Sequence, residues 1–346
     1  MAIKIEYRKF WLTLLVVFHV QFIFNTSYGQ PEVHLLPISV KSSFRALSVV
    51  DDSVAWVSGS QSWIGRTADG GQNWSFHQVT GFETLDFRSL YAFDSQTAII
   101  ANAGSPAYIL LTTNAGTSWQ VVYSNHHPNA FLDGIDFWNS KAGVVYGDPI
   151  DGRMLLLKTN DGGKTWREFP AASRPEVKAG EASFAASGTG ILCLGKSELM
   201  IATGGMISRL FRTTHQGKSW RTQEPPIIQG DEGTGIFSVA FHGERGMVVG
   251  GDFKKGIDPT GNAAYTEDGG RSWHKPNRAP GGYRECVVYL NGTTLVTTGP
   301  SGTEISNDGG KNWQALSNEG FHVVRKARQG SLVVLAGNEK LAVLKE

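Results

Sequence analysis

Short runs of alternating apolar and polar residues fill most of the chain and recur in a fixed order. In one repeat, the runs "DFRSLYAF", "QTAIIANA" and "AYILLTT" precede a polar turn, and "SWQVVY" follows it. Alternation with a period of two residues is typical of β-strands that bury one face. Four such runs per repeat predict a four-stranded unit.

The polar turn of each unit carries a tryptophan. It reads "LKTNDGGKTW" in one repeat and "ISNDGGKNW" in another, and its tryptophans are Trp74, Trp119, Trp166, Trp220, Trp273 and Trp313. Successive tryptophans are 40 to 54 residues apart. A period of this length indicates a propeller, a solenoid or an array, and four strands per repeat favour the propeller.

Two further positions recur in every turn. A glycine stands three residues before each tryptophan, and a threonine or serine stands seven residues before it. Glycine suits the positive φ of a tight hairpin, and the hydroxyl and Asp side chains can hydrogen-bond the backbone of the turn. The tryptophan can then cover the turn and pack between sheets. These residues therefore predict a structural turn and not a catalytic group.

The pattern S/T-x-D-x-G-x-T/S-W resembles the Asp-box, also called the bacterial neuraminidase repeat. That family includes sialidases, other glycan-active proteins and propellers similar to photosystem II stability/assembly factors. The bare form "TNDGGKTW" and the short blades look most like the last group. Two copies depart from the pattern, because Asn114 and His215 stand at the Asp position. Their turns are expected to be held less tightly.

Counting the units predicts seven blades. Six units carry a box, and a seventh, "GFHVVRKARQGSLVVLAGNEKLAVLKE", has three strand runs and no box. Its missing outer strand can come from "PEVHLLPISV", residues 31–40, which would leave no open sheet edge. The expected fold is all-β, a seven-bladed β-propeller of four-stranded blades closed by the N-terminal strand, with residues 30–346 as one domain. Sialidase propellers have six blades, so this count weakens a sialidase assignment.

The first 29 residues read as a secretory signal peptide. Lys4, Arg8 and Lys9 precede an apolar run, residues 10–24, and small residues follow it. The competing interpretation is a membrane anchor, for which the run is short. Export to the periplasm or the extracellular space is the expectation, with no membrane span left after removal. Two cysteines, Cys193 and Cys286, are read as small buried side chains, although an exported protein permits a disulfide.

Aligning the predicted inner strands by their apolar alternation gives one mostly ionisable column. It contains Arg45, Arg88, Asp133, Glu181, Phe237, Arg284 and His322. In a propeller these positions meet at one mouth of the central channel. They form either a polar pocket, whose arginines bind an anionic ligand, or a set of mutual ion pairs that plug the channel.

Other residues are expected on the same face. Two second strands end in Gly-Asp, which brings Asp148 and Asp252 to the mouth, and Trp63 is placed there as a stacking platform. Long links between blades lie on this face, and the boxes lie on the opposite one. His126 and His127 are adjacent in an extended segment, where side chains diverge, so no metal and no cofactor is predicted.

These residues leave two function classes open. The net charge of +1 gives no basic field for nucleic acid. In the glycosidase interpretation, Glu181, Asp133, Asp148 and Asp252 supply two catalytic carboxyl groups, and Arg45, Arg88, Arg284, His322 and Trp63 bind an acidic oligosaccharide. A lyase is a less favoured variant. "SFRAL" resembles, loosely, the Phe-Arg-Ile-Pro motif of sialidases, but Leu47 stands at the Pro position.

The alternative is a non-catalytic propeller that binds an anionic protein segment; the resemblance to the assembly factors implies a protein partner, and the arginines imply its charge. Nothing in the sequence implies photosynthesis. We expect a monomer that binds an acidic glycan, with hydrolysis as an open question. A deep pocket holding two carboxyl groups about 5–10 Å apart would favour hydrolysis, and carboxylates paired to arginine would favour binding alone.

Overall fold

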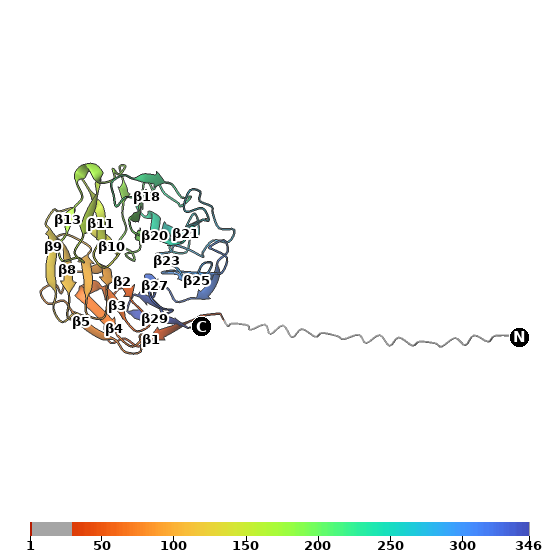
Figure 1. Ribbon diagram of the computed structural model, residues 1–346, viewed down its shortest axis with the longest axis horizontal. Coiled ribbons are helices and arrows are strands. Elements are labelled where there is room, and N and C mark those ends of the chain that lie inside the picture. The colour runs from red at the N-terminus through yellow and green to blue at the C-terminus, as the bar shows by residue number, and fades with distance from the viewer. Residues whose placement is uncertain (2–29, 346) are drawn as a thin grey trace.

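Seven antiparallel β-sheets surround a central axis in the computed structural model, which describes residue 1 and residues 30–345 (Figure 1). The predicted all-β, seven-bladed propeller is confirmed. The predicted signal peptide lies outside the described residues, apart from Met1. No helix in the described part of the chain has the length and apolar character needed to span a bilayer.

The blades follow one another along the chain, each with its first strand nearest the axis. Blade one is β2 (Phe44–Val49), β3 (Ala55–Gly59), β4 (Trp63–Thr67) and β5 (Ser75–Gln78); blade two is β6 (Phe87–Ala92), β7 (Ala98–Asn102), β8 (Ala107–Thr112) and β9 (Gln120–Asn125); blade three is β10 (Leu132–Phe137), β11 (Gly143–Ile150), β12 (Arg153–Thr159) and β13 (Arg167–Glu168). Blade four is β15 (Ile191–Leu194), β16 (Glu198–Ala202), β18 (Leu210–Thr213) and β19 (Arg221–Gln223); blade five is β20 (Thr234–His242), β21 (Arg245–Asp252) and β22 (Ala263–Thr266); blade six is β23 (Cys286–Tyr289), β24 (Leu295–Gly299), β25 (Gly302–Ser306) and β26 (Gln314–Ser317). Blade seven is β27 (Val323–Lys326), β28 (Val333–Gly337), β29 (Lys340–Lys345) and β1 (Glu32–Leu36). Two short 3-10 turns lie at Ser60–Ser62 and Ala171–Ser173.

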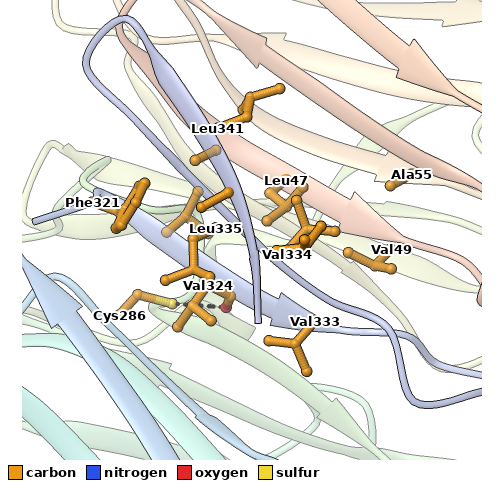
Figure 2. Close-up of a cluster of buried hydrophobic side chains, with 14 of the residues drawn as sticks. Leu47, Val49, Ala55, Cys286, Phe321, Val324, Val333, Val334, Leu335 and Leu341 are labelled. Atoms are coloured by element: carbon orange, nitrogen blue, oxygen red, sulfur yellow. Dashed lines mark hydrogen bonds between the residues drawn. The ribbon is translucent and has the colours of Figure 1, made fainter. Parts of the chain in front are cut away.

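The N-terminal strand closes the ring. β1 pairs antiparallel with β29, from Glu32 opposite Lys345 to Leu36 opposite Leu341. The predicted closure is therefore confirmed. A hydrophobic core joins this blade to its neighbours: Leu47 of β2, Val324 of β27 and Leu335 of β28 pack together in it (Figure 2).

The cysteines are not bridged. Cys286 is buried in the same core, where its thiol donates a hydrogen bond to the carbonyl of Val324 at 3.3 Å (Figure 2). Cys193 is a free, partly exposed cysteine of β15.

Blades four and five depart from the expected pattern. The prediction that residues 180–187 form the inner strand of blade four is wrong, because β15 takes that place. Instead, β14 (Glu181–Ala182) pairs with β17 (Gly204–Gly205), which pairs with β20 of blade five. The apolar residues after β14 alternate as in a strand, but they pack against blade five at the channel mouth. The outer edge of blade five is reduced to a bridge between Tyr265 and His274.

The box turns have the predicted architecture. In blade three, the Thr159 hydroxyl donates to Asp161 at 2.8 Å and accepts the N–H of Gly163 at 2.9 Å. Asp161 in turn accepts the N–H and the hydroxyl of Thr165. Gly163 has φ +82°, and its carbonyl accepts the indole N–H of Trp166 at 3.0 Å. Every box also donates one N–H to the turn between the first two strands of its own blade, so all six lie on one face.

The two divergent boxes behave differently from each other. Asn114 accepts the Thr112 hydroxyl and the N–H of Ser118, both at 3.0 Å, as an aspartate would. The expectation of a looser turn is wrong there, because the amide oxygen replaces the carboxylate. In the described structure the His215 side chain accepts no hydrogen bond from Ser219, four residues later. The Thr213 hydroxyl still accepts the N–H of Gly217 at 3.1 Å.

Candidate functional site

The inner strands begin at the channel mouth, on the face away from the boxes. In four blades a β-bulge inserts one extra residue near the start of the strand: Arg45 in β2, Arg88 in β6, Asp133 in β10 and Phe237 in β20. A bulge leaves this residue out of the regular pairing, so its side chain can be directed independently of the strand's alternation.

Blade six carries Glu285, and not Arg284, at this position. The N–H of Glu285 donates to the carbonyl of Thr298, which Cys286 also opposes. In blade seven, His322 and Val323 share Ala336 in the same way. The predicted column is therefore wrong at Arg284, because alternation cannot register the extra residue of a bulge, and correct at His322. It is also wrong at Glu181, which precedes β15 and belongs to another sheet.

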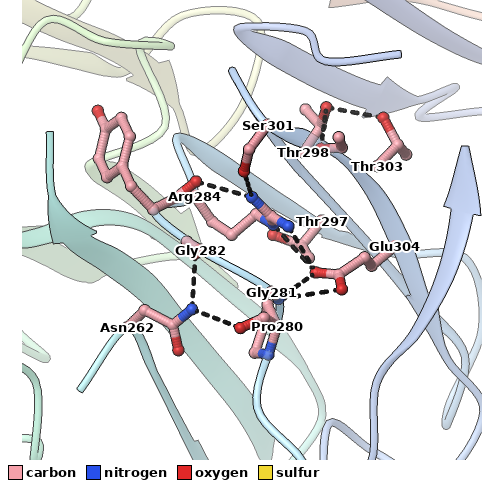
Figure 3. Close-up of polar contacts among 12 residues, drawn as sticks. Asn262, Pro280, Gly281, Gly282, Arg284, Thr297, Thr298, Ser301, Thr303 and Glu304 are labelled. Carbon is pink, nitrogen blue, oxygen red and sulfur yellow. Dashed lines mark hydrogen bonds and ion pairs between the residues drawn. The ribbon is translucent and has the colours of Figure 1, made fainter. Parts of the chain in front are cut away.

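Arg284 is enclosed at the junction of blades five and six. It is 2% exposed, and its Nε and Nη2 donate to Glu304 at 3.1 and 2.8 Å (Figure 3). Its Nη1 donates to the Ser301 hydroxyl at 2.8 Å, and the N–H of Gly281 also binds Glu304 at 3.0 Å. This guanidinium holds a link between blades in place.

Three residues of the mouth bind one another. Glu285, which is 4% exposed, accepts from Arg45 at 3.2 Å and pairs with Nδ1 of His322 at 2.8 Å. His322 Nε2 lies 3.2 Å from the Ser43 hydroxyl. Arg45 and His322, both predicted to bind an anionic ligand, thus share a carboxylate of the chain itself.

A segment of the chain, residues 183–188, fills the mouth beside this triad. Arg45 donates to the carbonyl of Ala186 at 3.1 Å, and the Ser187 hydroxyl donates to the carbonyl of Glu285 at 2.8 Å. Phe184 stacks on Phe237 with ring centroids 3.9 Å apart. We call residues 183–188 the plug segment; it contacts blades one, five and six at once.

Two carboxyl groups lie beside Arg88. Asp133 has 0% exposure, and neither of its oxygens has a hydrogen-bond partner. Burial raises its pKa well above the usual range; Asp148 adds to the rise and Arg88 opposes it. Burial also raises the pKa of Asp148, against the hydrogen bond from the Ser183 N–H. Burial thus disfavours the charged form of both carboxyl groups.

Glu181 is saturated with donors. It is 4% exposed and accepts from Nε and Nη2 of Arg209 at 2.9 and 2.5 Å. The Thr203 hydroxyl and the N–H of Lys178 bind it as well, at 2.6 and 2.9 Å. This arrangement fixes β14 and its loop.

The remaining predicted residues lie apart from one another. Arg88 pairs with Asp86 at 2.7 Å, with about a third of its side chain exposed. Asp252 is 5% exposed and lies 3.4 Å from Nζ of Lys255. Trp63 begins β4 and packs, partly buried, against the core of blades one and seven.

The mouth face also carries an apolar patch that was not predicted from the sequence. Met206 and Phe253 directly follow β17 and β21, the neighbours of β20 on either side, and Ile257 lies in the loop beyond. Their exposures are 50%, 49% and 82%. Phe253 also meets Phe237 edge-on, with centroids 6.4 Å apart. We call Met206, Phe253 and Ile257 the top-face patch.

Metal-ligating residues do not gather in the described part of the chain. Residues 30–345 hold no group of three or more His, Cys, Asp or Glu side chains suited to an ion. His126 packs edge-on against Tyr108, with ring centroids 6.1 Å apart.

Comparisons with known proteins agree on the architecture. The family model described as photosynthesis system II assembly factor YCF48 matches residues 30–130. Solved structures of YCF48 superpose over nearly the whole chain: the one bound to a D1 peptide has a TM-score of 0.64 at 16% identity, covering 92% of this chain and 96% of that one. YCF48 from Cyanidioschyzon merolae has a TM-score of 0.65 at 13% identity, covering 90% and 98%. The chain has the fold of an Asp-box β-propeller, and its residues 30–130 are similar to the photosystem II assembly factors.

The fold is also shared with an enzyme. The GH74 xyloglucanase from Xanthomonas campestris has a TM-score of 0.61 at 15% identity, covering 90% of this chain and 53% of that one. None of the curated proteins matches this Asp-box propeller. At these identities the likeness establishes the fold, and function must come from the residues of this chain.

A sequence signal for Glu285 was present. Gly59, Gly147, Gly250 and Gly299 lie in the second strands of four blades, opposite the start of the first strand, and a Cβ on each would lie 1.8 to 2.4 Å from the carbonyl oxygen two residues before the bulge. Aligning the blades on these glycines gives Arg45, Asp133, Phe237 and Glu285. The top-face patch has no such marker, because it lies in irregular loops.

Proposed function

We propose that this propeller is a non-catalytic binding protein that holds a segment of a partner protein on the mouth face, anchored at the top-face patch. The observation that carries the proposal is the clustering of exposed apolar side chains. Apart from Met1, the described residues expose five large hydrophobic side chains, and three of them, Met206, Phe253 and Ile257, are on this face. Exposed apolar groups gathered in one place are typical of interaction sites.

The state of the carboxyl groups supports binding over hydrolysis. A glycosidase needs two carboxyl groups flanking the scissile bond, one acting as the acid and one as an ionised base or nucleophile. Glu181 is held by Arg209, and Asp133 is 0% exposed and so out of reach of a substrate. Neither group is a free carboxylate at a pocket wall. The predicted acidic-glycan function therefore remains a hypothesis that rests on Arg88 and Asp148 alone.

The relatives add a second line of support. YCF48 has been solved with a D1 peptide bound, which makes a peptide segment a reasonable class of ligand for a related propeller. We further propose, from the N-terminal sequence alone, that the protein is exported to the periplasm or the extracellular space.

Peptide selection tests the proposal directly. A random twelve-residue phage library is panned against the purified protein, and enriched peptides are measured by calorimetry. Binding should weaken at least tenfold in Phe253→Ser/Ile257→Asp. It should be unchanged in the matched control Val121→Ser, which removes an exposed apolar residue from β9 on another surface. Peptides that bind both variants like wild type would place the site elsewhere and overturn the proposal.

The glycan alternative is tested in parallel. A panel of acidic oligosaccharides is screened by the shift in melting temperature, with Arg88→Ala as the matched variant. A shift that Arg88→Ala abolishes, together with failure of the peptide selection, would favour the glycan function.

A further inference from the structure

One of the seven box positions has no box, and a cavity lies there. Blade seven draws its outer strand from the N-terminus, so no hairpin joins β29 to β1 and no box turn can form. An open cavity of about 760 Å³ lies between blades six and seven. Its walls include Leu290, Ile305, Leu332 and Leu344, and Pro31 lies at its edge just before β1.

Equivalent residues in other blades show what this space corresponds to. The box of each blade rests on the preceding blade. A Cβ on Gly71 of the blade-one box would lie 3.4 Å from Val343, and one on Gly310 of the blade-six box would lie 3.7 Å from Cβ of Tyr265. In blade six, Ile305 has the position that Tyr265 has in blade five, next to the last residue of the third strand. Ile305 lines the cavity instead of supporting a box.

The last residue of the first strand is a cation at this cavity, whereas in blades with a buried box tryptophan it is aromatic. Phe137, the last residue of β10, lies edge-on to Trp166 with centroids 6.0 Å apart, and Tyr289, the last residue of β23, packs in the cluster of Trp313. The last residue of β27 is Lys326, which lines the cavity and donates to the carbonyl of Leu290 at 2.6 Å. The cavity has room for an indole beside this ammonium group, which is the arrangement of a cation–π contact, and the carboxylate of Asp52 also lines it.

We propose that this cavity binds an aromatic side chain, in particular the tryptophan of a turn presented by a partner protein. The occupant takes the place of the missing seventh box. A turn is favoured over free indole, because the box tryptophans Trp166 and Trp313 donate their N–H groups to their own turns, at 3.0 Å each. The volume falls within the range of protein ligand pockets, which is about 300–1,000 Å³. This site is on the box face, so it is separate from the top-face patch.

The chain itself supplies the probe. A fluorescently labelled peptide with the sequence of residues 157–168, "LKTNDGGKTWRE", is cyclised by a terminal disulfide to hold its turn. We expect saturable binding to the full mature chain by fluorescence anisotropy. The same peptide with Ala at the position of Trp166 should bind at least tenfold more weakly. Equal binding of the two peptides would overturn the proposal.

Variants locate the binding. Asn307→Trp and Thr294→Trp each place an indole in the cavity and should each weaken binding at least tenfold. Asn307 is exposed, so Asn307→Trp should retain the fold and remains the test if Thr294→Trp does not fold. Lys141→Trp is the matched control, an exposed residue in the corresponding turn of blade three. Unchanged binding in Asn307→Trp would show that the peptide binds elsewhere. Lys326→Met, which keeps the aliphatic stem, should weaken binding about threefold to tenfold, and wild-type affinity would exclude the cation–π contact.

Discussion

Asp161 of the blade-three box and Asp133 of the channel mouth show opposite uses of the same side chain. Asp161 accepts bonds from Thr159 and Thr165, within four residues on either side. Burial raises its pKa, but the hydrogen bonds from Thr165, Thr159 and Lys164 together outweigh burial, and the pKa is lowered overall. Asp133 has no bonded partner, and burial raises its pKa. A repeated local turn satisfies its carboxylate with its own neighbours, whereas the mouth depends on residues from distant blades.

Removing a box tryptophan should have the largest effect on stability. Trp166 is 7% exposed and packs against Phe137 and Ile99. Trp166→Ala should lower the free energy of unfolding by about 3–5 kcal/mol, as expected for a large buried aromatic residue. Urea denaturation measures this. Trp119 is partly exposed, so Trp119→Ala should lower the free energy of unfolding clearly less. Equal losses in the two variants would show that burial of the tryptophan does not determine how much a box contributes to stability.

Asp133→Asn should stabilise the protein at neutral pH. The raised pKa means that the folded state keeps a proton that the unfolded chain releases as pH rises above about 4. Stability from this residue is therefore lost as pH rises. We therefore expect a gain in the free energy of unfolding at pH 8 that disappears near pH 4. Denaturation at pH 8 and pH 4 checks this, and a gain that persists at pH 4 would contradict it.

Asp161→Ala should show the opposite pH dependence. A lowered pKa gives stability that is present above the unfolded pKa and is lost as pH falls through the folded value. The variant should cost about 1 kcal/mol at pH 7, the usual worth of a hydrogen bond, and the cost should shrink below about pH 3.8. Acid titration of both proteins by circular dichroism follows the difference. A cost that grows on acidification would reverse the assignment.

Arg88→Ala should have the smallest effect on the fold. Its pair with Asp86 is partly exposed, and such pairs contribute about 0–1 kcal/mol. We expect a change in the free energy of unfolding below about 0.5 kcal/mol by thermal denaturation. A loss above about 2 kcal/mol would mean that Arg88 supports the mouth as Arg284 supports its loop.

The same contrast explains what the sequence could predict. The boxes and the number of blades could be predicted because each box turn is built mainly from residues within about eight positions of one another. The closing strand could be predicted because the seventh unit has only three strand runs. The column failed at Arg284, where a bulge shifts the alternation by one residue. It failed at Glu181 because Phe184 and Ala186 alternate like strand residues yet bury themselves against Phe237. Whether an alternating run joins a sheet depends on what it packs against, and that information is absent from the run itself.

The pairing of β1 with β29 also sets the order in which the ring can form. Among the strands of residues 30–345, β1 is synthesised first, and its only sheet partner, β29, is synthesised last. Until then both edges remain unpaired, and unpaired edges template aggregation. Contacts between chain ends form slowly because a long loop must close first. A chain interrupted during translation would therefore contain most of the blades and still expose two unpaired sheet edges. In this fold, protection from edge-to-edge aggregation depends on synthesis of β29.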